Sequence, residues 1–156
     1  MTTSERSGPR VTLWLLRCTT AVVTVGVLLQ PVLAGGYLSG DFDLLWWHAT
    51  NASVLMSVAL AQIVVAVCFW LIGRGKPWPV LLSVALFFAA GVQTGMGYAR
   101  VLWVHIPLGV ALVLLALGLF AVVFHRSAKV GRPKREGAAA LTGELGPPRR
   151  LGVFRR

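Results

Sequence analysis

The chain alternates between long apolar segments and short polar connections, and this pattern predicts four membrane-spanning helices. A helix that rises about 1.5 Å per residue needs about 20 apolar residues to cross a hydrocarbon core of about 30 Å. Four segments meet this length: residues 11–34, 46–72, 78–98 and 101–125. We therefore expect an all-α integral membrane four-helix bundle over residues 11–125, preceded by a cytoplasmic N-terminal segment of residues 1–10.

The composition supports this interpretation, because 56% of the residues are hydrophobic and only 13% are charged. A soluble domain carries charges on about a quarter of its residues. The bases also predict an orientation: Arg100 is the one Lys or Arg in the connections that follow the first and third segments. By the positive-inside rule both termini are cytoplasmic, and the loops at residues 35–45 and at Arg100 are external. We expect a multi-pass protein of a bacterial-type cell membrane.

Residues 126–156 differ in composition from the apolar segments, because they contain nine basic and two acidic residues among many Gly, Pro and Ala residues. Such a segment cannot bury enough apolar surface to fold by itself, so we expect a disordered basic cytoplasmic tail. Its charge favours retention on the cytoplasmic side and attraction to anionic headgroups of the lipid bilayer. Because it has no interleaved aromatic residues beyond Phe154, nucleic acid is not an expected partner.

Two pairs of stretches resemble one another. LQPVLAGGY at residues 29–37 is similar to VQTGMGY at residues 92–98, and LLWWH before Ala49 is similar to VLWVH before Ile106. Each half is thus a helix ending in Gln and Gly, an external turn, and a helix opening with Trp and His. Since both hairpins begin and end inside, this pattern predicts two parallel helical-hairpin repeats, in which His48 and His105 are equivalent and lie at equal depth.

Helical periodicity directs both histidines toward the interior of the bundle. At about 100° per residue, each histidine shares a face with small and amide side chains. Polar side chains are costly in lipid unless they face protein, and small residues let helices approach. The expected inward faces comprise His48, Asn51, Ala52, Leu55, Ala59 and Gln62; His105, Gly109, Leu112 and Ala116; Gln30, Gly26 and Thr19; and Gln93, Ala89, Ala90 and Gly97.

Two imidazoles that face each other across a bundle suit the axial positions of one haem b, with His48 and His105 as metal ligands. Asn51 could orient the ring of His48, and Arg100 could pair with propionates. The alternative is a cofactor-free structural or accessory subunit, in which the Trp residues form an aromatic belt and the Gly and Gln residues pack helices. Flanking glycines that would let a porphyrin approach are Gly35, Gly36, Gly95 and Gly97.

The order of Gln and Gly, external turn and His, repeated twice, resembles one four-helix half of the haem A synthase family. HATNASVL from His48 and HIPLGVAL from His105 stand where that family carries its haem ligands. The chain is also similar to small four-helix bacterial membrane proteins of unknown function. It lacks the family's glutamate before the histidine, its arginine after it, and the second half. The resemblance therefore implies haem binding rather than the oxidative chemistry of haem A synthesis.

The sequence lacks the residues that other classes of function would require. The sequence shows no nucleophile with a base, no carboxylate pair and no phosphate loop, so an enzyme is not the expected class. A transmembrane relay through two haems needs four histidines, and His125 is the only third one. A transporter is disfavoured because the predicted spans hold no buried charge to bind a substrate. A membrane redox partner or a homo-oligomer is compatible with this reading.

Overall fold

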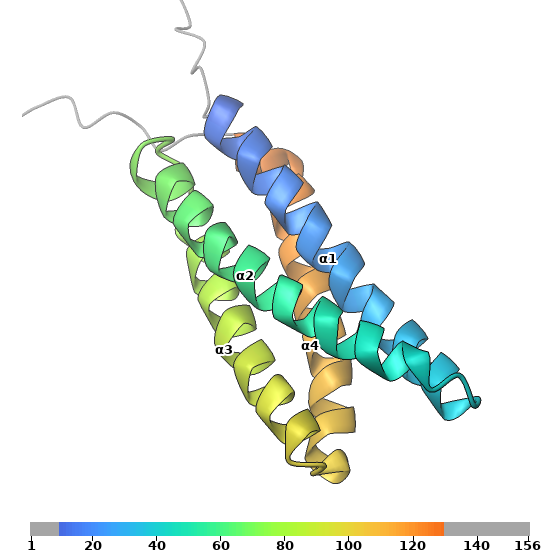
Figure 1. The fold of residues 1–156 in the computed structure, drawn as a ribbon. Helices are drawn as coiled ribbons and strands as arrows, with labels where there is room; N and C mark the ends of the chain where they lie inside the picture. The colour runs from blue at the N-terminus through green and yellow to red at the C-terminus, as the bar shows by residue number, and fades with distance from the viewer. Residues whose placement is uncertain (1–9, 130–156) are drawn as a thin grey trace, which may run out of the picture.

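The computed structural model describes residues 10–129, and these residues form four long helices and one short 3-10 helix without any strand. This confirms the all-α prediction of four helices, each long and apolar enough to cross a membrane. The length and composition of these helices are those of a multi-pass membrane protein. Figure 1 shows their arrangement. The elements are α1 (Arg10–Leu38), α2 (Asp43–Leu71), α3 (Trp78–Tyr98), α4 (Leu102–Phe124) and η1 (Arg126–Lys129).

The boundaries differ from the prediction at the connection between the first two helices and at the predicted tail. α1 continues through two glycines to Leu38 and α2 already begins at Asp43, so the loop is shorter than predicted. Continuation of a helix pairs backbone groups that would each cost several kcal/mol if left unpaired in lipid. Residues 126–129 form η1 with Ala128 buried, rather than the start of a disordered tail. The other predicted terminal regions, residues 1–9 and 130–156, lie outside the described residues.

The four helices pack in cyclic order, so that α1 and α3 each contact both α2 and α4, while α2 and α4 are diagonal to each other. We call the end where α1 begins and α4 finishes the terminal end. The opposite end, with the connections at residues 39–42 and 99–101, is the hairpin end. In Figure 1 the α1–α2 and α3–α4 hairpins diverge toward the hairpin end.

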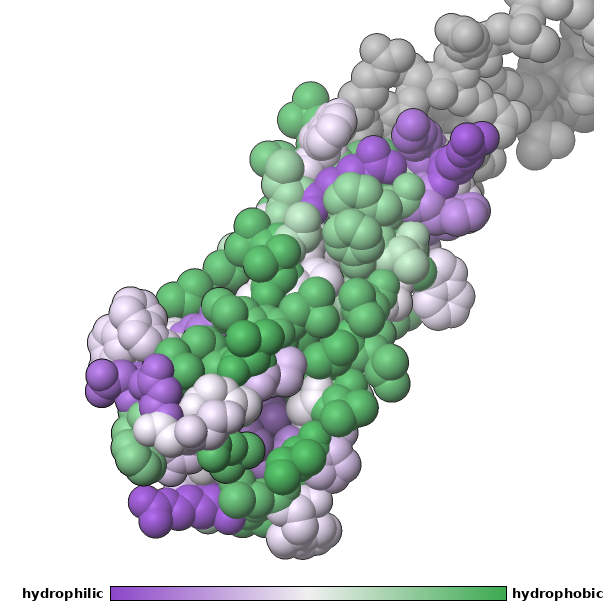
Figure 2. All heavy atoms as spheres, turned by 90° about the vertical axis from the view of Figure 1, so that its right-hand side faces the viewer, coloured by the Kyte–Doolittle hydropathy of each residue, from purple (hydrophilic) through white to green (hydrophobic). Residues whose placement is uncertain are grey.

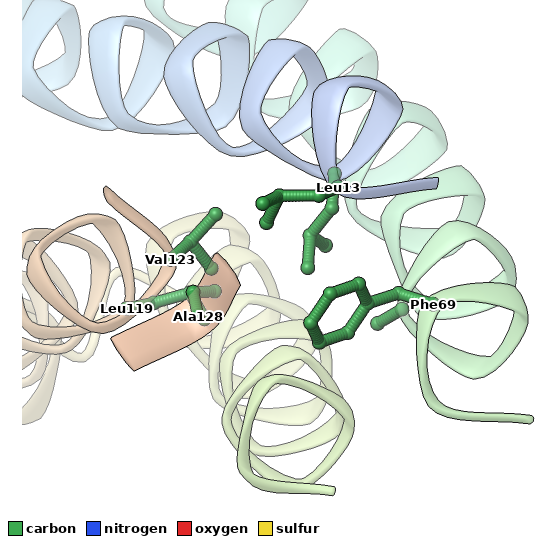
Figure 3. Packing of buried hydrophobic residues seen from close by; sticks show 7 residues of the cluster. Leu13, Phe69, Leu119, Val123 and Ala128 are labelled. Atoms are coloured by element: carbon green, nitrogen blue, oxygen red, sulfur yellow. The ribbon is translucent and has the colours of Figure 1, made fainter. Parts of the chain in front are cut away.

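The core consists of two apolar clusters stacked along the bundle axis. The cluster at the terminal end joins α1, α2, α4 and η1, and Figure 3 shows its side chains pointing toward one another. The second cluster lies nearer the hairpin end and includes one buried residue of α3, Leu86. The first cluster contains Leu13, Leu16, Ala66, Phe69, Leu119, Val123 and Ala128, and the second contains Val23, Val27, Leu55, Ala59, Leu86, Leu112 and Ala116.

Polar side chains occupy the level between these clusters. Thr20, Gln62 and Ser83 come from α1, α2 and α3, and each is at most 1% exposed. The Nε2 amide of Gln62 donates to Oγ of Ser83 over 3.1 Å, whereas its Oε1 has no partner among the described residues. The single bond thus ties α2 to α3 across the middle of the bundle.

We expect Ser83→Ala to destabilise the bundle by about 1 kcal/mol, because it leaves the buried amide of Gln62 without its partner. The double variant Gln62→Leu, Ser83→Ala should recover part of this loss, since an apolar side chain of similar size needs no hydrogen bond. Reversible unfolding in mixed detergent measures both changes. Ser57→Ala, on an exposed face of α2, serves as the control. A double variant less stable than Ser83→Ala would contradict this account.

The surface has the distribution that a bilayer requires. Figure 2 shows hydrophobic side chains across the middle of the molecule and hydrophilic ones gathered toward both ends. Large apolar side chains in the middle of every span are exposed, among them Val64 and Leu114. Trp46, Trp47 and Trp103 are exposed near the hairpin end, and Trp14 and Trp78 near the terminal end. Trp at both ends of the spans is typical of the two membrane interfaces.

Candidate functional site

The two histidines singled out from the sequence lie together at the hairpin end. His48, near the start of α2, and His105, near the start of α4, have ring centroids 6.2 Å apart and planes inclined by 58°. Both side chains are half-buried. Because α2 and α4 are diagonal, the rings meet across the interior of the bundle. In Figure 2 hydrophilic atoms lie recessed behind hydrophobic ones in the half of the molecule away from the grey segments.

Each ring is held by a backbone carbonyl of the preceding helix. Nδ1 of His48 lies 3.1 Å from the carbonyl oxygen of Gln30, and Nδ1 of His105 lies 2.9 Å from that of Gln93. A carbonyl oxygen only accepts, so Nδ1 carries the proton and donates in both rings. In the neutral imidazole, Nε2 then keeps its lone pair. The arrangement therefore presents two imidazole Nε2 acceptors from opposite sides of the bundle.

The turns that precede these histidines also share one hydrogen-bond pattern. In the α1–α2 turn the amide of Asp41 donates to Gly36 and that of Gly40 donates to Tyr37. In the α3–α4 turn the amide of Val101 donates to Met96 and that of Arg100 donates to Gly97. Both are Schellman motifs, with Gly40 and Arg100 at the left-handed position.

The shared turn aligns the two hairpins with an offset of about one helical turn. Gln30 lies ten residues before Gly40, whereas Gln93 lies seven before Arg100. His48 lies eight residues after Gly40, whereas His105 lies five after Arg100. Each arm of the first hairpin is thus three residues longer, which preserves the helix face at about 3.6 residues per turn. The longer first loop seen in the sequence comparison is this additional turn of helix.

The environment of His105 includes a close approach by α3. A Cβ atom added to Gly97 would lie 2.9 Å from Cε1 and 3.1 Å from Nδ1 of His105, so only glycine leaves the ring where it is. By contrast, a Cβ on Gly95 would meet nothing within 4 Å, and the same holds for Gly35. Of these sequence-predicted glycines, Gly97 is therefore the one whose missing side chain makes room for the ring of His105.

The other two residues predicted for the site are Asn51 and Arg100. Both lie close to the histidines along the chain. The side-chain amide of Asn51 donates to the carbonyl of Gly26 over 2.8 Å, which ties α2 to α1. The contact that orients the ring of His48 is made by Gln30, not by Asn51. Arg100 is exposed in the α3–α4 turn, at φ 58°.

Most residues that helical periodicity assigned to the inward faces are indeed turned toward the interior of the bundle. Leu55, Ala59 and Gln62 on α2 are buried, as are Leu112 and Ala116 on α4. On α1 the prediction was wrong by one residue: Thr20 is buried, whereas Thr19 bonds to carbonyls of its own helix. A hydroxyl that bonds its own helix needs no inward position, so periodicity alone did not separate the two threonines.

The carbonyl groups of Gln30 and Gln93 are the functional groups that sequence reasoning missed. The sequence suggested that their side chains bond between helices, but their backbone oxygens hold the histidines. The side-chain Oε1 atoms of both residues are buried without a partner among the described residues. Because every residue carries a backbone carbonyl, the residue type gave no signal for this role. Within residues 10–129, no group of three or more His, Cys, Asp or Glu side chains gathers.

The third histidine is remote from this pair. His125 follows α4 at the terminal end and is exposed, with its Nδ1 bonded to Ser127. Cys18 and Cys68 are free. The two facing imidazoles are therefore the principal candidate site at the hairpin end. The chain matches no protein-family model, no curated protein and no solved structure.

Proposed function

We propose that this membrane bundle binds one haem b between His48 and His105 and acts in electron transfer or haem handling at the external face. The observation that carries the proposal is the matched pair of rings, each with Nδ1 bonded to a Gln carbonyl and Nε2 left to coordinate. Histidine ligands of metals usually donate their other nitrogen in this way, which fixes the ring and raises its basicity. A haem with two imidazole ligands supplies one-electron transfer through its iron.

The separation of the rings supports a ligand pair. Two metal–nitrogen bonds of about 2.0–2.1 Å, together with the half-widths of two imidazoles, span roughly 6 Å. The observed centroid separation is 6.2 Å. The close approach of Gly97 to His105 also supports the proposal, because it holds this ring in one position.

The orientation and the duplication are part of the same proposal. The distribution of bases among the connections favours a hairpin end on the external side, with both termini in the cytoplasm. We interpret the two hairpins as repeats of one unit, supported by the shared Schellman turns and the shared His-to-carbonyl bonds. The haem A synthase resemblance agrees with this arrangement. A redox partner or a second copy of the chain would then approach from the external face.

The test is a titration of the purified protein with hemin in detergent, followed by absorption spectra before and after reduction with dithionite. We expect a Soret band with sharp reduced α and β bands, as a low-spin iron with two imidazoles produces. Absorbance from protein alone at saturating hemin would refute the proposal and favour a cofactor-free accessory bundle. Uptake of a divalent metal in place of hemin would also refute it, since a bare metal site would then explain the pair.

Arg100 offers a sharper prediction, because it occupies a backbone conformation that costs a non-glycine residue roughly 1–2 kcal/mol. The corresponding position in the first hairpin is Gly40. If the guanidinium binds a propionate, Arg100→Gly should weaken hemin binding several-fold while the stability of the turn stays equal or rises. Arg74→Gly is the matched control, since Arg74 has φ 55° at the terminal end. Equal changes in hemin affinity for both variants would contradict the role of Arg100.

A further inference from the structure

A groove at the terminal end lies far from the histidine pair. It has a volume of about 440 Å³ and runs between the start of α3 and the end of α4. Its polar lining consists of Lys76, His125 and Ser127, and the rest is apolar: Trp78, Leu82, Ala121 and Val122. The groove thus combines a basic mouth with an apolar wall.

Among the described residues, the positive charge at this mouth has no acidic counterpart nearby. Within residues 10–129 the carboxylates are Asp41 and Asp43, and both lie at the opposite, hairpin end. Lys76 is exposed, and Arg126 follows His125 directly. A positive charge that no described carboxylate neutralises attracts an anion.

The hydrogen bonds of His125 leave a donor free for that anion. The backbone amide of Ser127 donates to Nδ1 of His125 over 3.2 Å, so Nδ1 acts as an acceptor. In the neutral ring the proton then resides on Nε2, which remains a donor. Lys76 and His125 therefore provide an ammonium group and an N–H group beside the same groove.

The apolar wall of the groove favours a lipid over a soluble anion as its ligand. Leu82 and Val122 belong to spans that cross the membrane, so the wall continues from the mouth toward the hydrocarbon region. Trp78 stands at the start of α3, where an amphipathic ring suits the headgroup level. We propose that this groove binds an anionic phospholipid, with its phosphate at Lys76 and His125 and an acyl chain along Leu82 and Val122.

The test uses the fluorescence of Trp78, which lies in the groove. The protein is placed in phosphatidylcholine bilayers that contain equal fractions of either brominated phosphatidylglycerol or brominated phosphatidylcholine. The quenching of Trp78 itself is obtained as the difference between the fluorescence quenching of the wild type and that of Trp78→Phe. We expect the anionic lipid to be enriched about fivefold at Trp78, the effect of about one surface base. Because both lipids are compared with one preparation, absorbance by any haem cancels.

Lys76→Gln should remove this enrichment, and Arg100→Gln, at the hairpin end, should leave it unchanged. Both residues are exposed, so neither change disturbs the core. Equal quenching by the two lipids in the wild type would overturn the proposal. Enrichment that persists in Lys76→Gln would also overturn it, because a general surface potential would then account for the preference.

Discussion

Replacement of both His48 and His105 by alanine should remove the low-spin haem spectrum that the proposed function predicts, while the amount of protein in the membrane should stay the same. Loss of groups that merely orient a ligand lowers metal affinity about 10–100-fold, so loss of the ligands themselves should exceed about 100-fold. Each single variant should leave an iron with one protein ligand and a broadened, high-spin spectrum. Hemin titration and reduced-minus-oxidised spectra measure these outcomes.

His125→Ala is the control for this experiment, because His125 lies at the opposite end of the bundle. Its spectrum should equal that of the wild type. Sharp reduced α and β bands in the double variant would show that other residues hold the iron. The facing imidazoles would then be interfacial side chains that pack the bundle.

Gly97→Ala should lower hemin affinity about 10–100-fold, although it adds a single methyl group on a neighbouring helix. The new Cβ would lie 2.9 Å from Cε1 of His105, so the ring must move. That movement stretches the 2.9 Å contact between Nδ1 and the carbonyl of Gln93. Affinity from hemin titration and the proportion of high-spin iron report the change.

Gly95→Ala is the matched control on the same helix, because its added Cβ meets nothing within 4 Å. Both substitutions remove one glycine from α3 and change helix propensity equally, by about 1 kcal/mol in favour of the helix. Only the change at Gly97 touches His105. If both variants bind hemin as tightly as the wild type, the packing of Gly97 against His105 has no role in the site.

The position of the helices followed from local features of the sequence. Span length and apolar composition predicted four crossings, and periodicity placed Leu55, Ala59 and Gln62 on the inward face of α2. The boundary at Ala34 was wrong because glycine usually weakens a helix, whereas here α1 passes through Gly35 and Gly36 to Leu38. In an apolar environment the need to pair backbone groups outweighs that preference.

The candidate site was predictable only in part. Duplication pointed to His48 and His105 as partners, and the structure brings them together. Asn51 was expected to orient His48 because it lies one turn away on the same helix. Its amide instead reaches Gly26 on α1, and the carbonyl of Gln30 takes the orienting role. Backbone acceptors on another helix leave no residue-type signature, so a side-chain search does not find them.

The sequence by itself determined the four spans, their apolar surfaces and the helix faces on which the histidines lie, because these depend on length and period within one segment. The tertiary structure decided the 6.2 Å between the rings, the carbonyl that holds each Nδ1, and the approach of Gly97. These features depend on where one helix crosses another. Such crossings depend on the packing of side chains from all four helices, which no single segment encodes.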